Sequence, residues 1–228
     1  MIGIIGAMKI EVEALQSAME DVRAEQVGNL TFFAGKLEGK DAVVVKCGIG
    51  KVNAALCAQT LILCYHPDIL INTGVAGTLT DKLSVGDVAV SQGAVQHDLD
   101  TTALGDPAGL VPEANRVVLP TDEELAQKAL GCVRAEGLNA CLGVIASGDV
   151  FVSSPEKKAE IVRTFGAVAC EMEGAAIAHA AFLSGVRVLN LRAISDSANG
   201  DSPVDFPAFC RKAAAHSTRI TRALVRTL

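Results

Sequence analysis

Runs of continuously apolar, largely β-branched residues alternate along the 228-residue chain with stretches of helical pattern. Strands that are apolar at every position are typical of a sheet covered on both faces. Their alternation with helices predicts a three-layer α/β fold, in which helices flank a twisted central sheet that is mixed but mostly parallel. The predicted strands are 2–6, 42–47, 68–73, 87–95, 142–147, 167–171 and 186–193. The predicted helices are 9–22, 51–65, 122–136, 173–184 and 206–226.

No low-complexity linker or internal repeat interrupts this pattern, so a single domain spanning 1–228 is predicted. The residues expected to form the buried stripe of the first helix are Val12, Leu15, Met19 and Val22. Two long irregular stretches, 97–121 and 195–205, are interpreted as lids or interface segments, with disorder as the alternative.

Charge and cysteine usage restrict the partners and the compartment. The net charge is −6 and no block of Lys or Arg occurs, which disfavours nucleic acid and anionic membranes and favours a small-molecule ligand. The seven cysteines form no CxxC pair, as expected for reduced thiols in the cytosol. Acidic residues follow the first strand too soon for a signal peptide, and no apolar run is long enough to span a membrane. A cytoplasmic, soluble protein is therefore expected.

Three glycine-containing turns, 3–7, 48–51 and 74–77, follow three predicted strands. In open α/β sheets ligands bind outside the carboxyl ends of the strands, where glycine lets the backbone approach them. Each turn alone is equally well a tight strand-to-helix connection. None completes a dinucleotide or nucleoside-triphosphate fingerprint. Together the three turns predict a shared ligand cleft.

Glu11 opens the first helix, directly after the first glycine turn. A phosphate site at this helix start would avoid an anion and recruit arginine, yet no arginine flanks any of the glycine turns. Glu11 alone could simply complement the helix dipole at the surface. Because the residues of a phosphate site are missing here, a catalytic role for the Glu11 carboxylate is favoured instead.

Glu171 and Glu173 lie where a hydrophobic strand meets an apolar helix. Buried carboxylates at such a junction need hydrogen-bonding partners. Glu173 could cap the helix, and the functional alternative is that the carboxylates bind the diol of a sugar.

Asp196 follows the last predicted strand, where chemistry is well placed in an α/β fold, although a turn or cap role is also open. Phe151 follows another strand and could stack on a base, although core packing is the commoner role. His97, Asp98 and Asp100 resemble a metal cluster, but no second His or Cys group lies nearby in sequence, so no metal and no cofactor are expected.

Seven segments of the chain jointly resemble the bacterial 5′-methylthioadenosine/S-adenosylhomocysteine nucleosidases. They are IGIIGAMKIEVEAL (2–15), CGIGKVNAA (47–55), INTGVAG (71–77), VGDVAVS (85–91), SGDVFV (147–152), CEMEGAAIAH (170–179) and RAISDSA (192–198). They run in order over nearly the whole chain. The resemblance implies a purine nucleoside phosphorylase-like fold and hydrolysis of the adenine N-glycosidic bond, serving methionine salvage and methyl-cycle detoxification. It also implies a homodimer in which 97–121 lies near the neighbouring site.

The same resemblance assigns roles to individual residues. Glu11 would activate the attacking water, and Asp196 would protonate adenine at N7. Met172 and Glu173 would hold the ribose near Val75 and Glu171, with Arg192 in support. Phe151 would stack on adenine, the Val152 backbone would read its edge, and Ser195 would adjoin the acid. Met8, Ile49 and Phe206 would line the pocket for the 5′-alkylthio group.

Two carboxylates suit this reaction because it has two difficulties. Cleavage passes through an oxocarbenium-like sugar, and adenine leaves poorly as an anion. A protonated acid on the base and an ionised base beside the water address both, as in inverting glycosidases. Asp196 is therefore expected to hold a proton in a dry site, and Glu11 to be ionised.

Three positions depart from the family pattern. Val75 stands where many members have serine, and Leu104 and Asp106 stand where aromatic residues are frequent. We hypothesise that Asp106 attracts the ammonium group of homocysteine. The preference among methylthioadenosine, S-adenosylhomocysteine and 5′-deoxyadenosine is left open by the sequence.

Four other functions compete with this interpretation. A phosphate-dependent purine nucleoside phosphorylase would need a cationic phosphate site, and a futalosine-type nucleosidase would run the same reaction on another 5′ group. A non-catalytic adenosine sensor would need Phe151 and Glu173 but not both catalytic carboxylates. A dinucleotide-dependent oxidoreductase lacks its full glycine fingerprint.

Overall fold

The computed structural model describes residues 1–196 and 206–228, with the side chains of residues 206 and 207 excluded. The strands are β1 (Ile2–Gly6), β2 (Glu20–Val27), β3 (Leu30–Leu37), β4 (Lys40–Lys46), β5 (Ile69–Thr78), β6 (Val88–Gln96), β7 (Leu119–Pro120), β8 (Ala140–Ser147), β9 (Ala167–Glu171) and β10 (Arg187–Asp196). The helices are α1 (Lys9–Ser17), α2 (Lys51–Tyr65), α3 (Glu123–Ala135), α4 (Pro155–Phe165), α5 (Gly174–Ser184) and α6 (Phe206–Thr227), with a 3₁₀ turn η1 (Thr102–Leu104).

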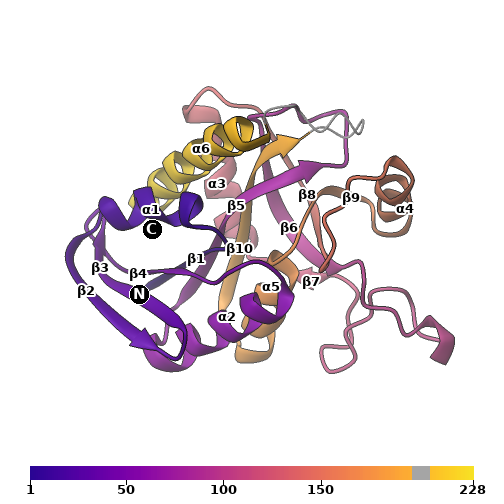
Figure 1. Ribbon diagram of the computed structural model, residues 1–228, viewed down its shortest axis with the longest axis horizontal. Helices are drawn as coiled ribbons and strands as arrows, with labels where there is room; N and C mark the ends of the chain where they lie inside the picture. The colour runs from indigo at the N-terminus through magenta and orange to yellow at the C-terminus, as the bar shows by residue number, and fades with distance from the viewer. Residues whose placement is uncertain (197–205) are drawn as a thin grey trace.

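Strand β5 is the hub of the sheet (Figure 1). It pairs in parallel with β1 and with β10, and its last residues pair antiparallel with β9. Strands β10, β6, β8 and β9 continue from β5 and return to it, so these five strands close into a ring, while β1, β4, β3 and β2 extend from it as an open sheet. The carboxyl ends of several parallel strands therefore converge on one region.

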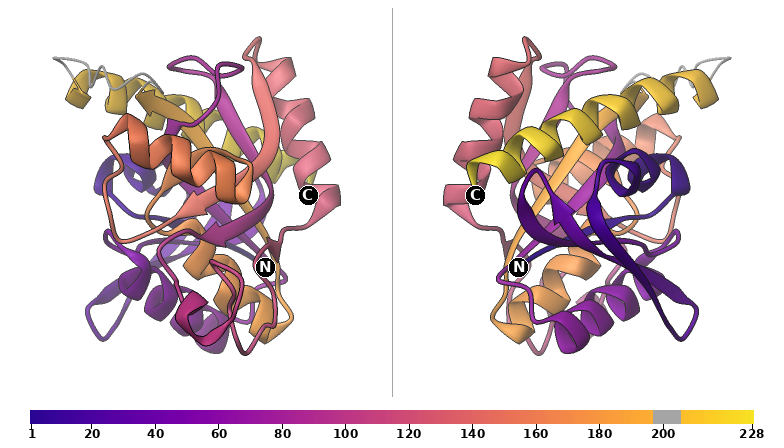
Figure 2. Two further views of the ribbon diagram at one scale, coloured as in Figure 1. Left: turned by 90° about the vertical axis from the view of Figure 1, so that its right-hand side faces the viewer. Right: turned by 90° about the vertical axis from the view of Figure 1, so that its left-hand side faces the viewer.

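Helices cover both faces of the sheet, because successive residues of a strand point to opposite sides. Ile4 and Ile71 pack with α1, α3 and α6 in one core, whereas their neighbours Ile5 and Leu70 pack with α2 and α5 in another. Figures 1 and 2 show these two helix layers on either side of the strands. The predicted α/β fold with a central mixed sheet and flanking helices is confirmed. No helix among the described residues is long and apolar enough to cross a membrane.

The prediction for the first helix is wrong at its carboxyl end. The helix ends at Ser17, and β2 begins at Glu20 and forms a hairpin with β3. Val22, expected on the buried stripe, lies on β2 and is 41% exposed. Nearly all of β2 is exposed and half of its residues are charged, so it lacks the apolar run that marks the predicted strands.

Helix α4 was not predicted either, although its start carries a recognisable signal. Ser154 caps the helix by accepting a hydrogen bond from the Lys157 N–H, and Pro155 occupies the first turn. The unpredicted hairpin also changes the balance of the sheet. It contributes antiparallel pairs, which lie beside the parallel pairs β1–β4, β1–β5, β10–β5, β6–β8 and β8–β9, so the described sheet is mixed.

Helix α4 provides a test of this packing. Ile161 is 1% exposed and faces the small core beneath α4, whereas its neighbour Val162 is 37% exposed. We expect Ile161→Ala to lower the free energy of unfolding by about 2–4 kcal/mol, because it leaves a cavity. Val162→Ala on the same helix should change it by less than about 1 kcal/mol. Urea denaturation measures both, and equal losses would contradict the orientation of α4.

Candidate active site

A cavity lies where the carboxyl ends of β1, β5, β8, β9 and β10 meet. The structure brings all predicted site residues but two to its wall: Met8, Glu11, Ile49, Val75, Phe151, Val152, Glu171, Met172, Glu173, Ser195 and Asp196. Arg192 lies beneath the wall, fully buried. Phe206 begins α6, and its side chain lies outside the described part of the structure. Ala7, Ala76 and Gly77, from the glycine turns predicted to form a ligand cleft, also line the cavity, as do Val150 and Cys170, which were not predicted.

Glu11 is a buried carboxylate held by backbone donors. It is 3% exposed, which excludes the alternative of a surface residue on the helix dipole. One oxygen accepts hydrogen bonds from the N–H groups of Ala7 and Met8 at 2.7 and 2.8 Å, and the other accepts from Val75 N–H at 3.1 Å. Burial raises the pKa of Glu11, while Arg192 and these N–H groups oppose the rise.

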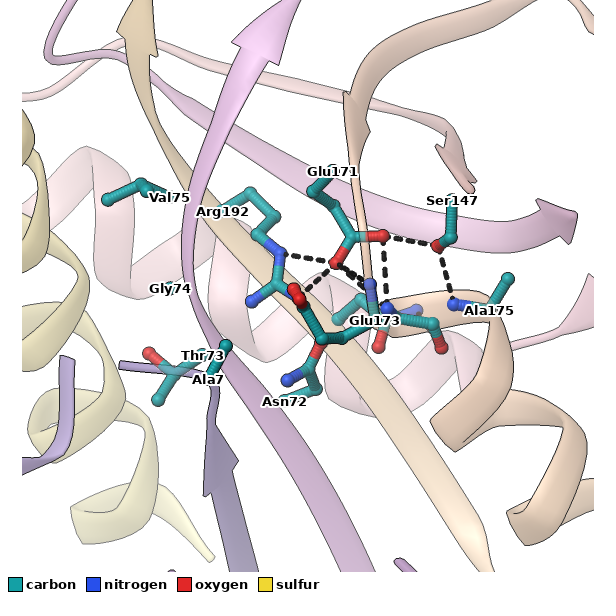
Figure 3. Close-up of polar contacts among 12 residues, drawn as sticks. Ala7, Asn72, Thr73, Gly74, Val75, Ser147, Glu171, Glu173, Ala175 and Arg192 are labelled. Atoms are coloured by element: carbon teal, nitrogen blue, oxygen red, sulfur yellow. Dashed lines mark hydrogen bonds and ion pairs between the residues drawn. The ribbon is translucent and has the colours of Figure 1, made fainter. Parts of the chain in front are cut away.

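Arg192 is the cation around which the carboxylates are arranged (Figure 3). Its guanidinium donates to Glu171 Oε2 and to Asn72 Oδ1, and it lies 3.9 Å from Glu173 Oε2. Gly74 leaves room for this arrangement, because a Cβ there would lie 2.5 Å from Glu11 Oε1 and 2.7 Å from Arg192 Nη1. The glycine therefore serves the close approach of two protein side chains.

Glu171 caps helix α5, the role considered in the sequence for Glu173. Its carboxylate accepts from the N–H groups of Glu173 and Gly174 and from the Ser147 hydroxyl (Figure 3). Glu173 makes no capping hydrogen bond; its Oε1 accepts from Gly50 N–H at 2.9 Å instead. Glu171 is thus tied to protein donors.

The ionisation of Glu173 is poised near neutrality. Burial, followed by repulsion from Glu171, raises the pKa of Glu173 to about 7, although Arg192 and the Gly50 N–H oppose this. At the wall of a cavity such a carboxyl can accept a hydrogen bond from a hydroxyl when ionised and donate one when protonated.

Asp196 ends β10 on another side of the cavity. It is 8% exposed, and its Oδ1 accepts from the Ser195 hydroxyl at 2.9 Å. A Cβ at Gly77 would lie 2.6 Å from Asp196 Oδ2, so glycine again provides the space. Lys158, a buried residue of α4, places its ammonium 3.9 Å from the same oxygen. Lys158 was not predicted as a site residue, because the helix that carries it, α4, was not predicted.

The loop after β8 is anchored away from the cavity. Asp149 Oδ1 accepts from Lys51 N–H at 2.7 Å, and Asp149 N–H donates to Asp98 Oδ2 at 2.8 Å. Asp98 also accepts from the Lys51 ammonium at 2.6 Å. These contacts fix the loop that carries Phe151, which is 57% exposed at the mouth of the cavity.

The charges facing the cavity suit a ligand that develops positive charge. Among the described residues that line it, Glu11, Glu171, Glu173 and Asp196 are acidic and none is Lys or Arg. Arg192 is already engaged by carboxylates. A phosphate dianion would find no cationic wall here, whereas a carbohydrate acquiring positive charge would be stabilised.

The dependence of the site on Arg192 can be tested through stability. Arg192→Met leaves buried carboxylates without their cation, so at about pH 8 the free energy of unfolding should fall by about 3–5 kcal/mol. The pKa values of these carboxyls in the folded variant then exceed their unfolded values. Such groups stabilise the fold at low pH and cease to do so as pH rises, so the deficit should shrink at about pH 5.

Urea denaturation at both pH values measures this effect. The matched control is Arg187→Met, because Arg187 pairs with Asp122 while its side chain is 42% exposed; its loss should stay below about 1 kcal/mol. An Arg192→Met deficit that is the same at both pH values would show that the cation does not balance these carboxylates.

The chain is similar to known proteins over its whole length. The family model described as the phosphorylase superfamily matches residues 1–226. A 5′-methylthioadenosine/S-adenosylhomocysteine nucleosidase from Shewanella halifaxensis is 41% identical over 229 aligned residues, covering 100% of this chain and 99% of that protein. The crystal structure of the nucleosidase of that name from Neisseria meningitidis, in complex with methylthio-immucillin-A, superposes with a TM-score of 0.95 at 39% identity, covering 100% of this chain and 99% of the other.

A futalosine hydrolase from Helicobacter pylori is also similar in structure, with a TM-score of 0.94 at 35% identity, covering 100% of this chain and 97% of the other. The fold alone therefore does not choose between these two substrates. The full-length identity does establish the family. The chain belongs to the phosphorylase superfamily and, within it, to the 5′-methylthioadenosine/S-adenosylhomocysteine nucleosidases.

Proposed function

We propose that this protein hydrolyses the N-glycosidic bond of 5′-methylthioadenosine and S-adenosylhomocysteine, and also of 5′-deoxyadenosine, releasing adenine and the 5′-substituted ribose. The observation that carries the proposal is the pair of buried carboxylates, Glu11 and Asp196, on one cavity whose described wall has no cation. The named relatives support the choice of nucleoside.

The two carboxylates divide the chemistry. Asp196 gives its proton to N7 of adenine as the C1′–N9 bond breaks and its electron pair leaves with the base. Water then attacks the anomeric carbon of the oxocarbenium-like sugar, and its proton passes to Glu11. The backbone donors that hold Glu11 fix the direction of its carboxylate, which places the water.

The remaining wall residues hold the substrate. Glu173 accepts hydrogen bonds from the ribose hydroxyls, beside Met172 and Val75. Phe151 stacks on adenine, the Val152 backbone meets its edge, and Ser195 orients the acid. Met8 and Ile49, together with Phe206, surround the 5′ group. Arg192 supports substrate binding indirectly, because it binds Glu171, whose carboxylate in turn holds the start of α5.

Futalosine hydrolysis is the second candidate function, because a futalosine hydrolase shares this fold closely. Phosphorolysis is disfavoured by the acidic wall of the cavity.

We infer that the protein is a homodimer. Helices α2 and α5 expose Val52, Leu56, Leu63 and Leu183, each more than half exposed, beside a groove that both helices line. Leu104, in the irregular stretch 97–121, is 82% exposed. An apolar surface of this kind suits a second copy, whose 97–121 stretch would then complete the 5′ pocket and bring Asp106 toward the homocysteine ammonium.

We propose that the protein works in a reducing compartment, the cytoplasm; the seven cysteines, all free thiols in the structure, support this proposal.

Adenine release tests the catalytic proposal. Without phosphate, the protein should release adenine from methylthioadenosine and S-adenosylhomocysteine. Glu11→Gln and Asp196→Asn should each lower kcat/KM by at least about 100-fold, because each removes a proton-transfer group. Glu13→Gln, an exposed change on the same helix, is the control. Release of the purine base from futalosine alone would instead support the second candidate, and no release of a base from any of these nucleosides would contradict the reaction.

The dimer is tested by sedimentation. Leu56→Asp should convert the wild-type dimer to a monomer, because it places a charge in the apolar face of α2. Val22→Asp, at an exposed position of β2, should leave the dimer intact. A monomeric wild type, or a dimeric Leu56→Asp variant, would contradict this interface.

A further inference from the structure

Three buried hydroxyl groups lie between helix α6 and strand β5, outside the cavity wall. Thr73 Oγ1 lies 2.6 Å from Ser217 Oγ and 2.8 Å from Thr221 Oγ1. Ser217 and Thr221, one helical turn apart, are 1% and 0% exposed. The proposed reaction does not use these hydroxyls. Burying a polar group costs free energy, so their presence in the core calls for a structural or functional explanation.

Ser217 differs from Thr221 in one contact. The backbone N–H of Gly74 donates to Ser217 Oγ at 3.2 Å. The next N–H along the strand, that of Val75, donates to Glu11 Oε1 at 3.1 Å. One short stretch of β5 therefore links a hydroxyl of α6 to the carboxylate proposed as the base.

The link is tight on the Glu11 side. The space a Cβ would take at Gly74 is already filled by Glu11 Oε1 and Arg192 Nη1. Packing this close transmits small displacements of the backbone to the side chains that touch it. Figure 3 shows Thr73, Gly74 and Val75 at consecutive positions of β5, beside Arg192.

We propose that Ser217 is a positioning residue for catalysis, which holds the Gly74–Val75 backbone so that the Val75 N–H stays directed at Glu11. The inference rests on the proposed role of Glu11 as the base. Thr221, although it belongs to the same hydroxyl cluster, serves only packing and Thr73.

Losing this alignment affects the ionisation of Glu11. A hydrogen bond from Val75 N–H favours the charged carboxylate, so weakening it raises the pKa of Glu11 beyond the rise that burial already causes. The other groups facing Glu11 are Arg192 from β10, Glu173 before α5, and the thiols of Cys47 and Cys210. Burial raises the pKa of both thiols, so they stay neutral as pH falls, and neither thiol accounts for an acid-side change.

The experiment compares Ser217→Ala with Thr221→Val in the full-length protein, using methylthioadenosine or whichever nucleoside the wild type cleaves. Both variants remove one buried hydroxyl from the same cluster and should lose similar thermal stability. Ser217→Ala should lower kcat by roughly 5- to 50-fold with little change in KM, because the base is misaligned after binding. Its pH profile should lose activity at a higher pH on the acid side than the wild type does.

Thr221→Val should keep kcat within roughly twofold of the wild type and leave the acid side of the profile unchanged. Equal kcat values and equal acid-side profiles for the two variants would overturn the proposal, because the cluster would then be purely structural. An inactive wild type would instead overturn the proposed function, so the two failures are distinguishable.

Discussion

The site depends on one buried cation. Arg192 is fully buried on β10 and compensates Glu171 directly, with Glu173 and Glu11 close by. A single guanidinium cannot balance three carboxylates, so the site carries excess negative charge. Burial raises the pKa values of Glu11 and Glu173, and repulsion from Glu171 adds to the rise at Glu173. That excess is useful for glycoside cleavage, because it stabilises a sugar that becomes positively charged in the transition state. The same charge opposes a phosphate nucleophile.

The hub strand β5 explains how distant segments reach this cation. It lies between β1, which leads into Glu11, and β10, which carries Arg192 and Asp196. From the sequence, the glycines of β5 were expected to let the backbone approach a ligand. They do lie at the cavity, but they make room for other side chains of the protein. At Gly74 and Gly77 the missing Cβ makes room for protein carboxylates and for Arg192. The glycine pattern therefore marks the site correctly, while the groups it accommodates belong to the protein.

Much of the fold was predictable because several central strands, β1 among them, contain continuous apolar runs that identify them without tertiary information. The hairpin β2–β3 was not, because β2 is exposed and charged and its stability comes from pairing with β3. Helix α4 carries a local start signal, Ser154 followed by Pro155, so its beginning is predictable from the sequence. Within the site, the positions of Glu11 and Asp196 at the ends of strands were predictable from the sequence. Two features depend on contacts that the local sequence does not reveal. They are the capping of α5 by Glu171 and the approach of Lys158 to Asp196.

In the proposed reaction carboxylates activate water and phosphate takes no part. The most direct measurement runs the reaction in ¹⁸O-labelled water with phosphate present and analyses the sugar product by mass spectrometry. Hydrolysis should give a free 5′-substituted ribose with one ¹⁸O at the anomeric carbon, released together with adenine. A 5′-substituted ribose 1-phosphate without label would contradict it, because phosphate would then be the nucleophile.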